Sequence, residues 1–88
     1  MNEMEKFIKE NLTKETRKEL IGDIEVGDKL VFKNGYGVKL EFNVIGFNYD
    51  DDFNKKYNSY IYLDWDCYWY PIGLDRIIKV IKKEKKND

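Results

Sequence analysis

The sequence predicts an α+β fold, mainly β, in which an N-terminal amphipathic helix precedes a five-stranded antiparallel barrel. Apolar residues recur at steps of three and four over 3–12, and from residue 30 onward they alternate with polar residues. The 88 residues are enough for one hydrophobic core. We therefore expect a single domain over 1–88, with a helical segment 3–21, a barrel 26–82 and a basic tail 83–88.

The helical segment has one apolar stripe, one N-cap residue and one stop signal. The stripe consists of Met4, Phe7, Ile8 and Leu12. Thr13 is a suitable N-cap for a second short turn that ends at Ile21, and Gly22 offers a C-terminal stop. A helix this short is marginal alone, so we expect its stripe to dock on the barrel or on a partner.

Period-2 alternation and turn residues define the strands. Asn34 and Gly35 predict a hairpin turn, and Gly46 interrupts the next strand, which indicates a bulge. The polar stretch 48–58 predicts an exposed loop. The five expected strands cover residues 30–32, 38–44, 59–63, 68–72 and 77–82.

Two segments carry a resemblance to a known architecture. The run Val26-Gly27-Asp28-Lys29-Leu30 opens a strand, and Trp69-Tyr70-Pro71-Ile72-Gly73-Leu74-Asp75-Arg76-Ile77 precedes the last one. This outline resembles SH3-like small barrels, in which a Tyr-Pro segment, one helical turn and a short apolar strand close the barrel. The resemblance covers roughly 26–82 and implies that Pro71 and 73–75 form that turn. It implies a binding role without naming a partner, because such barrels bind peptides, nucleic acids and other proteins.

Composition excludes several classes of protein. A formal charge of -1 argues against both a DNA-mimicking polyanion and a histone-like polycation. Cys67 is the only cysteine, so no internal disulfide is expected, and no apolar run is long enough for a signal peptide or a membrane span. We expect a cytoplasmic protein. The absence of His, Ala and Gln, with 14 lysines against 2 arginines, indicates AT-rich codons and a bacterial or phage origin.

The residues that usually carry catalysis are scarce. There is no histidine, which removes the commonest general base and zinc ligand and leaves Cys67 without an activating partner. No glycine-rich phosphate loop is present, and the aspartates at 50–52, 64 and 66 do not have calcium-loop spacing. We therefore expect no enzymatic activity, no metal and no cofactor.

An aromatic cluster is the first candidate binding site. A tight turn at Trp65 and Asp66 places Ile61, Leu63, Tyr68 and Tyr70 on the core face, which leaves Tyr60, Tyr62 and Trp69 on the opposite face. If the N-terminal helix does not cover these three, they form an anchor for a protein partner or a stacking surface for bases. The predicted partner-binding residues are Tyr60, Tyr62, Trp65, Trp69, Asp50, Asp51 and Asp52.

A basic C-terminal stretch is the second candidate. Its members are Arg76, Lys79, Lys82, Lys83, Lys85 and Lys86, and they could contact phosphates or serve only as a solubilising tail and a lysine-guarded edge strand. The favoured expectation is a non-enzymatic protein-interaction module, in concrete form a phage or mobile-element accessory protein that inhibits a host defence protein. The alternative is a nucleic-acid-binding SH3-like module, and homodimerisation through the aromatic patch is a third.

Overall fold

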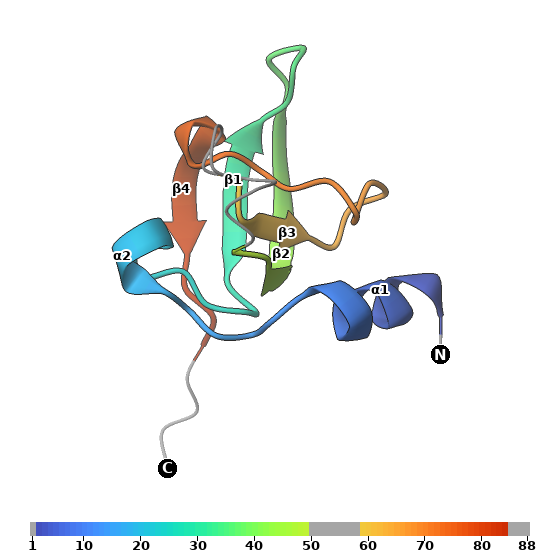
Figure 1. Cartoon of the computed structure of the whole chain (residues 1–88). Coiled ribbons are helices and arrows are strands. Elements are labelled where there is room, and N and C mark those ends of the chain that lie inside the picture. The colour runs from blue at the N-terminus through green and yellow to red at the C-terminus, as the bar shows by residue number, and fades with distance from the viewer. Residues whose placement is uncertain (1, 50–58, 85–88) are drawn as a thin grey trace.

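The computed structural model describes residues 2–49 and 59–84, and in this part the chain forms a small, mainly β, α+β structure (Figure 1). Its elements are α1 (Glu3–Asn11), α2 (Lys18–Ile21), β1 (Lys29–Lys33), β2 (Lys39–Phe47), β3 (Ile61–Leu63), the 3-10 helix η1 (Leu74–Arg76) and β4 (Ile77–Ile81). The strands build an open antiparallel four-stranded sheet in the order β3-β2-β1-β4. The α+β class is thus confirmed, whereas five strands and a closed barrel are not present among the described residues.

The predicted hairpin forms between β1 and β2, but its loop is longer than Asn34 and Gly35. The side-chain Oδ1 of Asn34 accepts hydrogen bonds from the backbone N–H groups of Tyr36 (2.8 Å) and Val38 (3.0 Å). Gly37 adopts the positive φ of 79° that ends the loop. As a result the first pair beyond the loop is Lys33 opposite Lys39.

The core lies on one face of the sheet. Its fully buried side chains include Leu30 and Phe32 from β1, Val44 and Phe47 from β2, and Ile61 and Leu63 from β3. Strand β3 is buried on both faces, because Ile61 and Leu63 belong to the core and Phe7 of α1 covers Tyr62 between them. The alternation predicted for β1 and β2 therefore holds, whereas β3 has no solvent-facing side.

The bulge predicted at Gly46 is present, and the chain that follows α1 crosses β2 at this point. The register between β2 and β3 shifts between Val44 and Gly46. Thr13 forms an antiparallel bridge to Phe47, with two backbone hydrogen bonds of 2.8 Å. A side chain at Gly46 would place its Cβ 2.9 Å from the Cβ of Leu12, so only glycine leaves room for this crossing.

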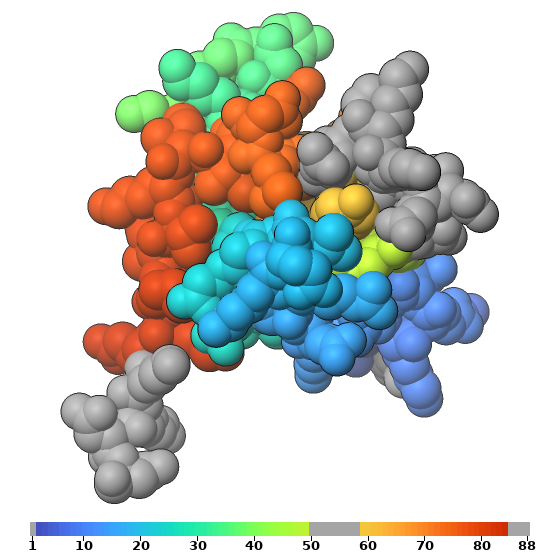
Figure 2. Space-filling view, turned by 60° about the vertical axis from the view of Figure 1, so that its left-hand side comes forward, coloured from blue at the N-terminus to red at the C-terminus, as the bar shows by residue number. Residues whose placement is uncertain are grey.

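The helical segment predicted over 3–21 consists of two separate helices joined by a non-helical stretch. Thr13 does not cap a helix, because its backbone is engaged in the bridge to β2, and α2 begins only at Lys18. Gly22 ends α2 with φ of 75°, as predicted, and its N–H donates to the carbonyl of Lys18 (2.9 Å). Figure 2 shows the segment between α1 and β1 spread across one face of the molecule, where it contributes the buried Ile21 and Ile24.

The strand expected at 68–72 does not form. The chain turns instead, with the N–H of Tyr70 donating to the carbonyl of Cys67 (2.8 Å). Only Ile72 pairs with β3, through a single bridge to Ile61. A helical turn, η1, follows this segment and leads directly into β4, where the resemblance to SH3-like barrels placed one.

Neither helix in the described part of the chain has the length and apolar character that crossing a bilayer requires.

Candidate functional site

The aromatic residues predicted to bind a partner separate into buried and exposed groups. Tyr62 is only 4% exposed, because Phe7 of α1 packs on it with ring centroids 5.7 Å apart, and the same Phe7 ring lies 5.6 Å from Tyr68. Tyr60 is equally buried and packs against Tyr49 at 5.8 Å. The N-terminal helix therefore docks on the sheet and makes Tyr62 part of the core. The sequence had left open whether this helix covers the aromatic residues.

Trp65 also belongs to the core and not to an exposed turn. Its indole packs edge-on against Phe32 at 5.8 Å and lies 6.3 Å from Phe42. The indole nitrogen Nε1 is buried and has no hydrogen-bond partner within the described residues. Trp65 is thus half-buried against the core, and its Nε1 donor is unpaired among the described residues.

Trp69 and Tyr70 remain on the surface. They are 54% and 58% exposed, and the ring of Trp69 meets that of Tyr68 edge-on at 5.0 Å. The expectation that Tyr70 lies on the core face is therefore wrong, because no hairpin forms to place it there. Of the predicted aromatic site, Trp69 is the member that stays open to a partner.

Several predicted site residues lie outside the described residues: Asp50, Asp51, Asp52, Lys85 and Lys86. Within 2–49 and 59–84 there is no group of three or more Cys, Asp or Glu side chains that could hold a metal ion.

Lys82 and Lys83 bond to groups of the chain itself, at the surface above the fully buried carboxylate of Asp28. The Nζ of Lys82 donates to Oδ2 of Asp28 and to the carbonyl of Asp23, and it lies 3.3 Å from Oε1 of Glu25. The backbone N–H of Lys83 donates to Oδ1 of Asp28 (3.0 Å), and its Nζ donates to the carbonyl of Val26 (2.9 Å). We call these residues the Asp28 cluster.

Hydrogen bonds set the charge state of the Asp28 cluster. Burial acts to raise the pKa of Asp28, but hydrogen bonds from Lys82, Lys83 and Glu25 outweigh it, and the pKa is lowered. Burial likewise acts to lower the pKa of Lys82, and the hydrogen bonds to Asp28 and Glu25 leave it raised. Both groups are therefore charged at neutral pH, and the two lysines fasten the end of β4 to the 23–28 loop.

The outer face of the β2-β1-β4 sheet carries most of the remaining strand cations. The register places Lys33 opposite Lys39, Val31 between Glu41 and Lys79, and Lys29 between Asn43 and Ile81. The charges on this face are those of Lys29, Lys33, Lys39, Lys79 and Glu41. Although the whole chain has a formal charge of -1, this face is positive.

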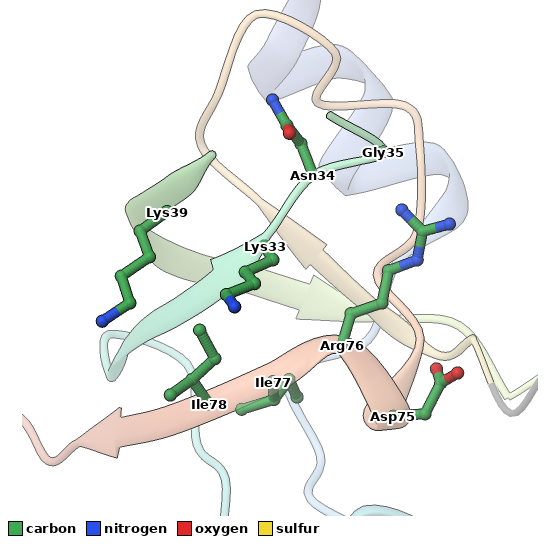
Figure 3. A pocket seen from close by; sticks show the side chains of 8 residues that line it. All are labelled: Lys33, Asn34, Gly35, Lys39, Asp75, Arg76, Ile77 and Ile78. Atoms are coloured by element: carbon green, nitrogen blue, oxygen red, sulfur yellow. The ribbon is translucent and has the colours of Figure 1, made fainter. Parts of the chain in front are cut away.

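One end of this face is hollowed into an open groove of about 600 Å³. Its lining residues are Lys33, Asn34, Gly35, Lys39, Asp75, Arg76, Ile77 and Ile78. Lys33 and Lys39 extend to the same side above Ile78, whereas Asp75 lies on the opposite side of the view from Lys39 (Figure 3). The bulge between β1 and β4 leaves Ile78 without a cross-strand partner and 48% exposed.

No described residue forms an ion pair with the cations of the groove. These cations are Lys33, Lys39 and Arg76, and they have no such pair even though Asp75 is adjacent to Arg76 in the sequence. Like charges directly opposite each other in a sheet are destabilising, so the pair of Lys33 and Lys39 works against the fold. At the other end of the same face, Lys29 is paired with Glu41 at 3.3 Å.

The structure thus brings two of the predicted basic residues, Arg76 and Lys79, together with two that the sequence analysis missed. Lys33 and Lys39 lie far from the C-terminal stretch in the sequence and were assigned no role. The signal was present in the hairpin, because a lysine flanks each side of the loop. The predicted two-residue turn at Asn34 and Gly35 would pair Lys33 with Tyr36. That register does not place Lys33 opposite Lys39, so the cation pair was not predicted.

A comparison of the chain with models of known protein families, with curated proteins and with solved structures found no match.

Proposed function

We propose that this chain is a non-enzymatic module that binds nucleic acid through the groove and the outer face of the β2-β1-β4 sheet. The observation that carries the proposal is that Lys33, Lys39 and Arg76 line one groove and form no ion pair with any described residue. Proteins tend to violate a local stability rule where function demands it, and a like-charge pair with no acidic partner is such a violation. A bound phosphate would relieve the repulsion and supply the missing counter-charge.

The spread of the cations favours a chain of phosphates over one small anion. Neighbouring strands lie about 4.8 Å apart, so cations on β2, β1 and β4 are distributed over about 10 Å. Lys79, opposite Val31, extends the set along the sheet away from the groove. A single phosphate contacts only part of such a set, whereas a nucleic-acid backbone presents charges along its length.

A salt titration of binding tests the proposal. We expect the full chain to bind labelled oligonucleotides in fluorescence anisotropy at about 50 mM salt, with an affinity that falls steeply as salt rises. The Lys33→Gln plus Lys39→Gln variant should bind more weakly and lower the salt slope by about 0.7 per lost phosphate contact on a single strand. The matched control is Lys6→Gln plus Lys9→Gln, which removes the same charge from the exposed side of α1.

Two results would contradict this function. One is the absence of binding to both single-stranded and duplex oligonucleotides at low salt. The other is an equal loss of affinity in the groove variant and in the α1 control, because net charge alone would then account for binding.

Binding to a protein is a second candidate function, favoured by the exposed pair of Trp69 and Tyr70. Exposed aromatic side chains are typical anchors of protein interfaces. In this candidate the chain is an accessory protein that binds and inhibits a host defence protein. Affinity capture from a bacterial lysate with the wild type and with Trp69→Ala plus Tyr70→Ala tests it: a protein retained by the wild type and lost by the folded variant supports the candidate.

For the fold, we propose the SH3-like arrangement that the sequence resembles. The helical turn η1 before β4 and the bridge between Ile61 and Ile72 support it. An experimental structure that includes residues 50–58 tests whether the sheet closes into a barrel.

A further inference from the structure

We infer that the groove selects single-stranded over duplex nucleic acid, an inference that rests on the proposed function and specifies its ligand. The cations of the outer face are interleaved with apolar side chains. Ile78 lines the groove beside Lys33 and Lys39, and Ile81 is exposed on the same face, opposite Lys29. A duplex keeps its bases stacked inside and offers such side chains little contact, whereas a single strand can turn its bases onto them.

The hairpin loop carries an exposed aromatic residue, Tyr36, directly after two residues that line the groove, Asn34 and Gly35. Tyr36 is 94% exposed, and its ring contacts no other ring of the described residues. Its backbone is nevertheless fixed, because its N–H donates to Oδ1 of Asn34, a residue that lines the groove. Gly35 and Gly37 flank it and present no side chain that would obstruct the ring. Tyr36 is therefore placed to stack on a base whose phosphates lie on Lys33 and Lys39.

The same hairpin is poorly equipped to recognise a duplex. A two-stranded β-ribbon fits the major groove, but reading base edges there requires donors and acceptors at its tip. Oδ1 of Asn34 is occupied by two backbone N–H groups, which leaves Nδ2 of Asn34 and the hydroxyl of Tyr36 as the side-chain polar groups of the loop. A duplex would thus be contacted mainly through its phosphates, whereas a single strand would add contacts with Tyr36 and Ile78.

Competition between strand forms tests this inference with the full-length chain. The probe is a labelled oligothymidylate of about 12 nucleotides, and the competitors are the same strand without label and its duplex with oligoadenylate. We expect the single strand to bind about tenfold more tightly than the duplex. Tyr36→Leu should weaken single-strand binding about fivefold or more and leave duplex binding unchanged, and Tyr36→Phe, which keeps the ring, should bind as the wild type does.

The outcomes separate this inference from the proposed function. Equal affinity for the two forms, or equal single-strand binding by Tyr36→Leu and Tyr36→Phe, would overturn the single-strand inference. If the Lys33→Gln plus Lys39→Gln variant still loses affinity in that case, nucleic-acid binding itself stands. Failure of the wild type to bind either form would overturn both.

Discussion

At the scale of single residues, the buried carboxylate of Asp28 joins the 23–28 loop to the end of β4. It accepts hydrogen bonds from the backbone N–H groups of Glu25 and Lys83 and from the side chain of Lys82. In Asp28→Asn an amide NH2 group replaces one carboxylate oxygen, so a donor faces another donor and one hydrogen bond is lost. The substitution also removes the negative charge that pairs with Lys82. We expect this variant to lose about 3 kcal/mol of unfolding free energy in urea titrations. A loss below about 0.5 kcal/mol, the usual effect of a surface substitution, would contradict this role.

The same residue gives stability a dependence on acid. Because the pKa of Asp28 is lowered on folding, its contribution is fully present above about pH 4, the ordinary pKa of an aspartate, and is lost as pH falls toward the folded value. Lys82, Glu25 and Lys83 are the charged residues that contact it. The difference in unfolding free energy between wild type and Asp28→Asn should therefore be constant near neutral pH and shrink below pH 4. A difference that stays constant down to about pH 2 would show that the carboxylate's charge is not the cause.

At the scale of elements, Gly46 is the point where the segment after α1 crosses β2. A Cβ there would lie 2.9 Å from the Cβ of Leu12 and 3.3 Å from the carbonyl oxygen of Thr13. Gly46→Ala should therefore destabilise the fold by about 1–3 kcal/mol in thermal or urea unfolding. The control is Gly35→Ala, whose Cβ would meet no atom within 4 Å and which should be neutral or slightly stabilising. Equal stability of the two variants would mean that the crossing is not close-packed in solution.

Helix α1 contributes to the fold through Phe7. Its ring contacts both Tyr62 and Tyr68, and truncation would expose both rings. We expect Phe7→Ala to lower the unfolding free energy by about 2 kcal/mol, less than for a fully buried phenylalanine because the ring is half-buried. Lys6→Ala, on the exposed side of the same helix, should change it by less than about 0.5 kcal/mol. If Phe7→Ala is as stable as Lys6→Ala, the helix does not dock on Tyr62.

The sequence predicted those elements whose pattern is local. The stripe of α1, the stop at Gly22, the hairpin at Asn34 and the bulge at Gly46 each follow from nearby residue types. The segment 68–72 was predicted as a strand from its aromatic and β-branched content, but a strand needs a neighbour. The neighbour available to it offers one bridge at Ile61, so tertiary context overrode propensity.

The candidate site was predictable only in part, because its composition depends on tertiary contacts that a local sequence pattern does not show. Arg76 and Lys79 were identified as basic, and both lie where a ligand can reach them. Lys82 and Lys83 look equivalent in sequence, but the buried Asp28, 54 and 55 residues away, engages one through its side chain and the other through its backbone N–H. No periodicity marks a partner at that separation, whereas the apolar stripe of α1 did indicate that Phe7 docks on the barrel or on a partner.

At the scale of the whole molecule, the outer sheet face has opposite effects on stability and on binding. The pair of Lys33 and Lys39 attracts an anionic ligand, but its repulsion destabilises the fold. Lys39→Glu would place a carboxylate opposite Lys33 and should raise the unfolding free energy by about 0.5 kcal/mol, while nucleic-acid affinity falls at least about tenfold. Glu41→Lys is the reciprocal change, since it breaks the 3.3 Å pair with Lys29. It should lower stability by a similar amount and tighten binding.

Urea unfolding and anisotropy on the same four proteins, namely the wild type, the two single variants and the double variant, measure both quantities. The double variant keeps the wild-type net charge and moves the acid two residues along β2, from the middle of the face to the groove. If only net charge mattered, its affinity would equal that of the wild type. If the groove is the binding site, its affinity stays low, because the acid now lies beside Lys33 and Arg76 where the phosphates are expected. Wild-type affinity in the double variant would therefore exclude the groove and leave a diffuse attraction as the explanation.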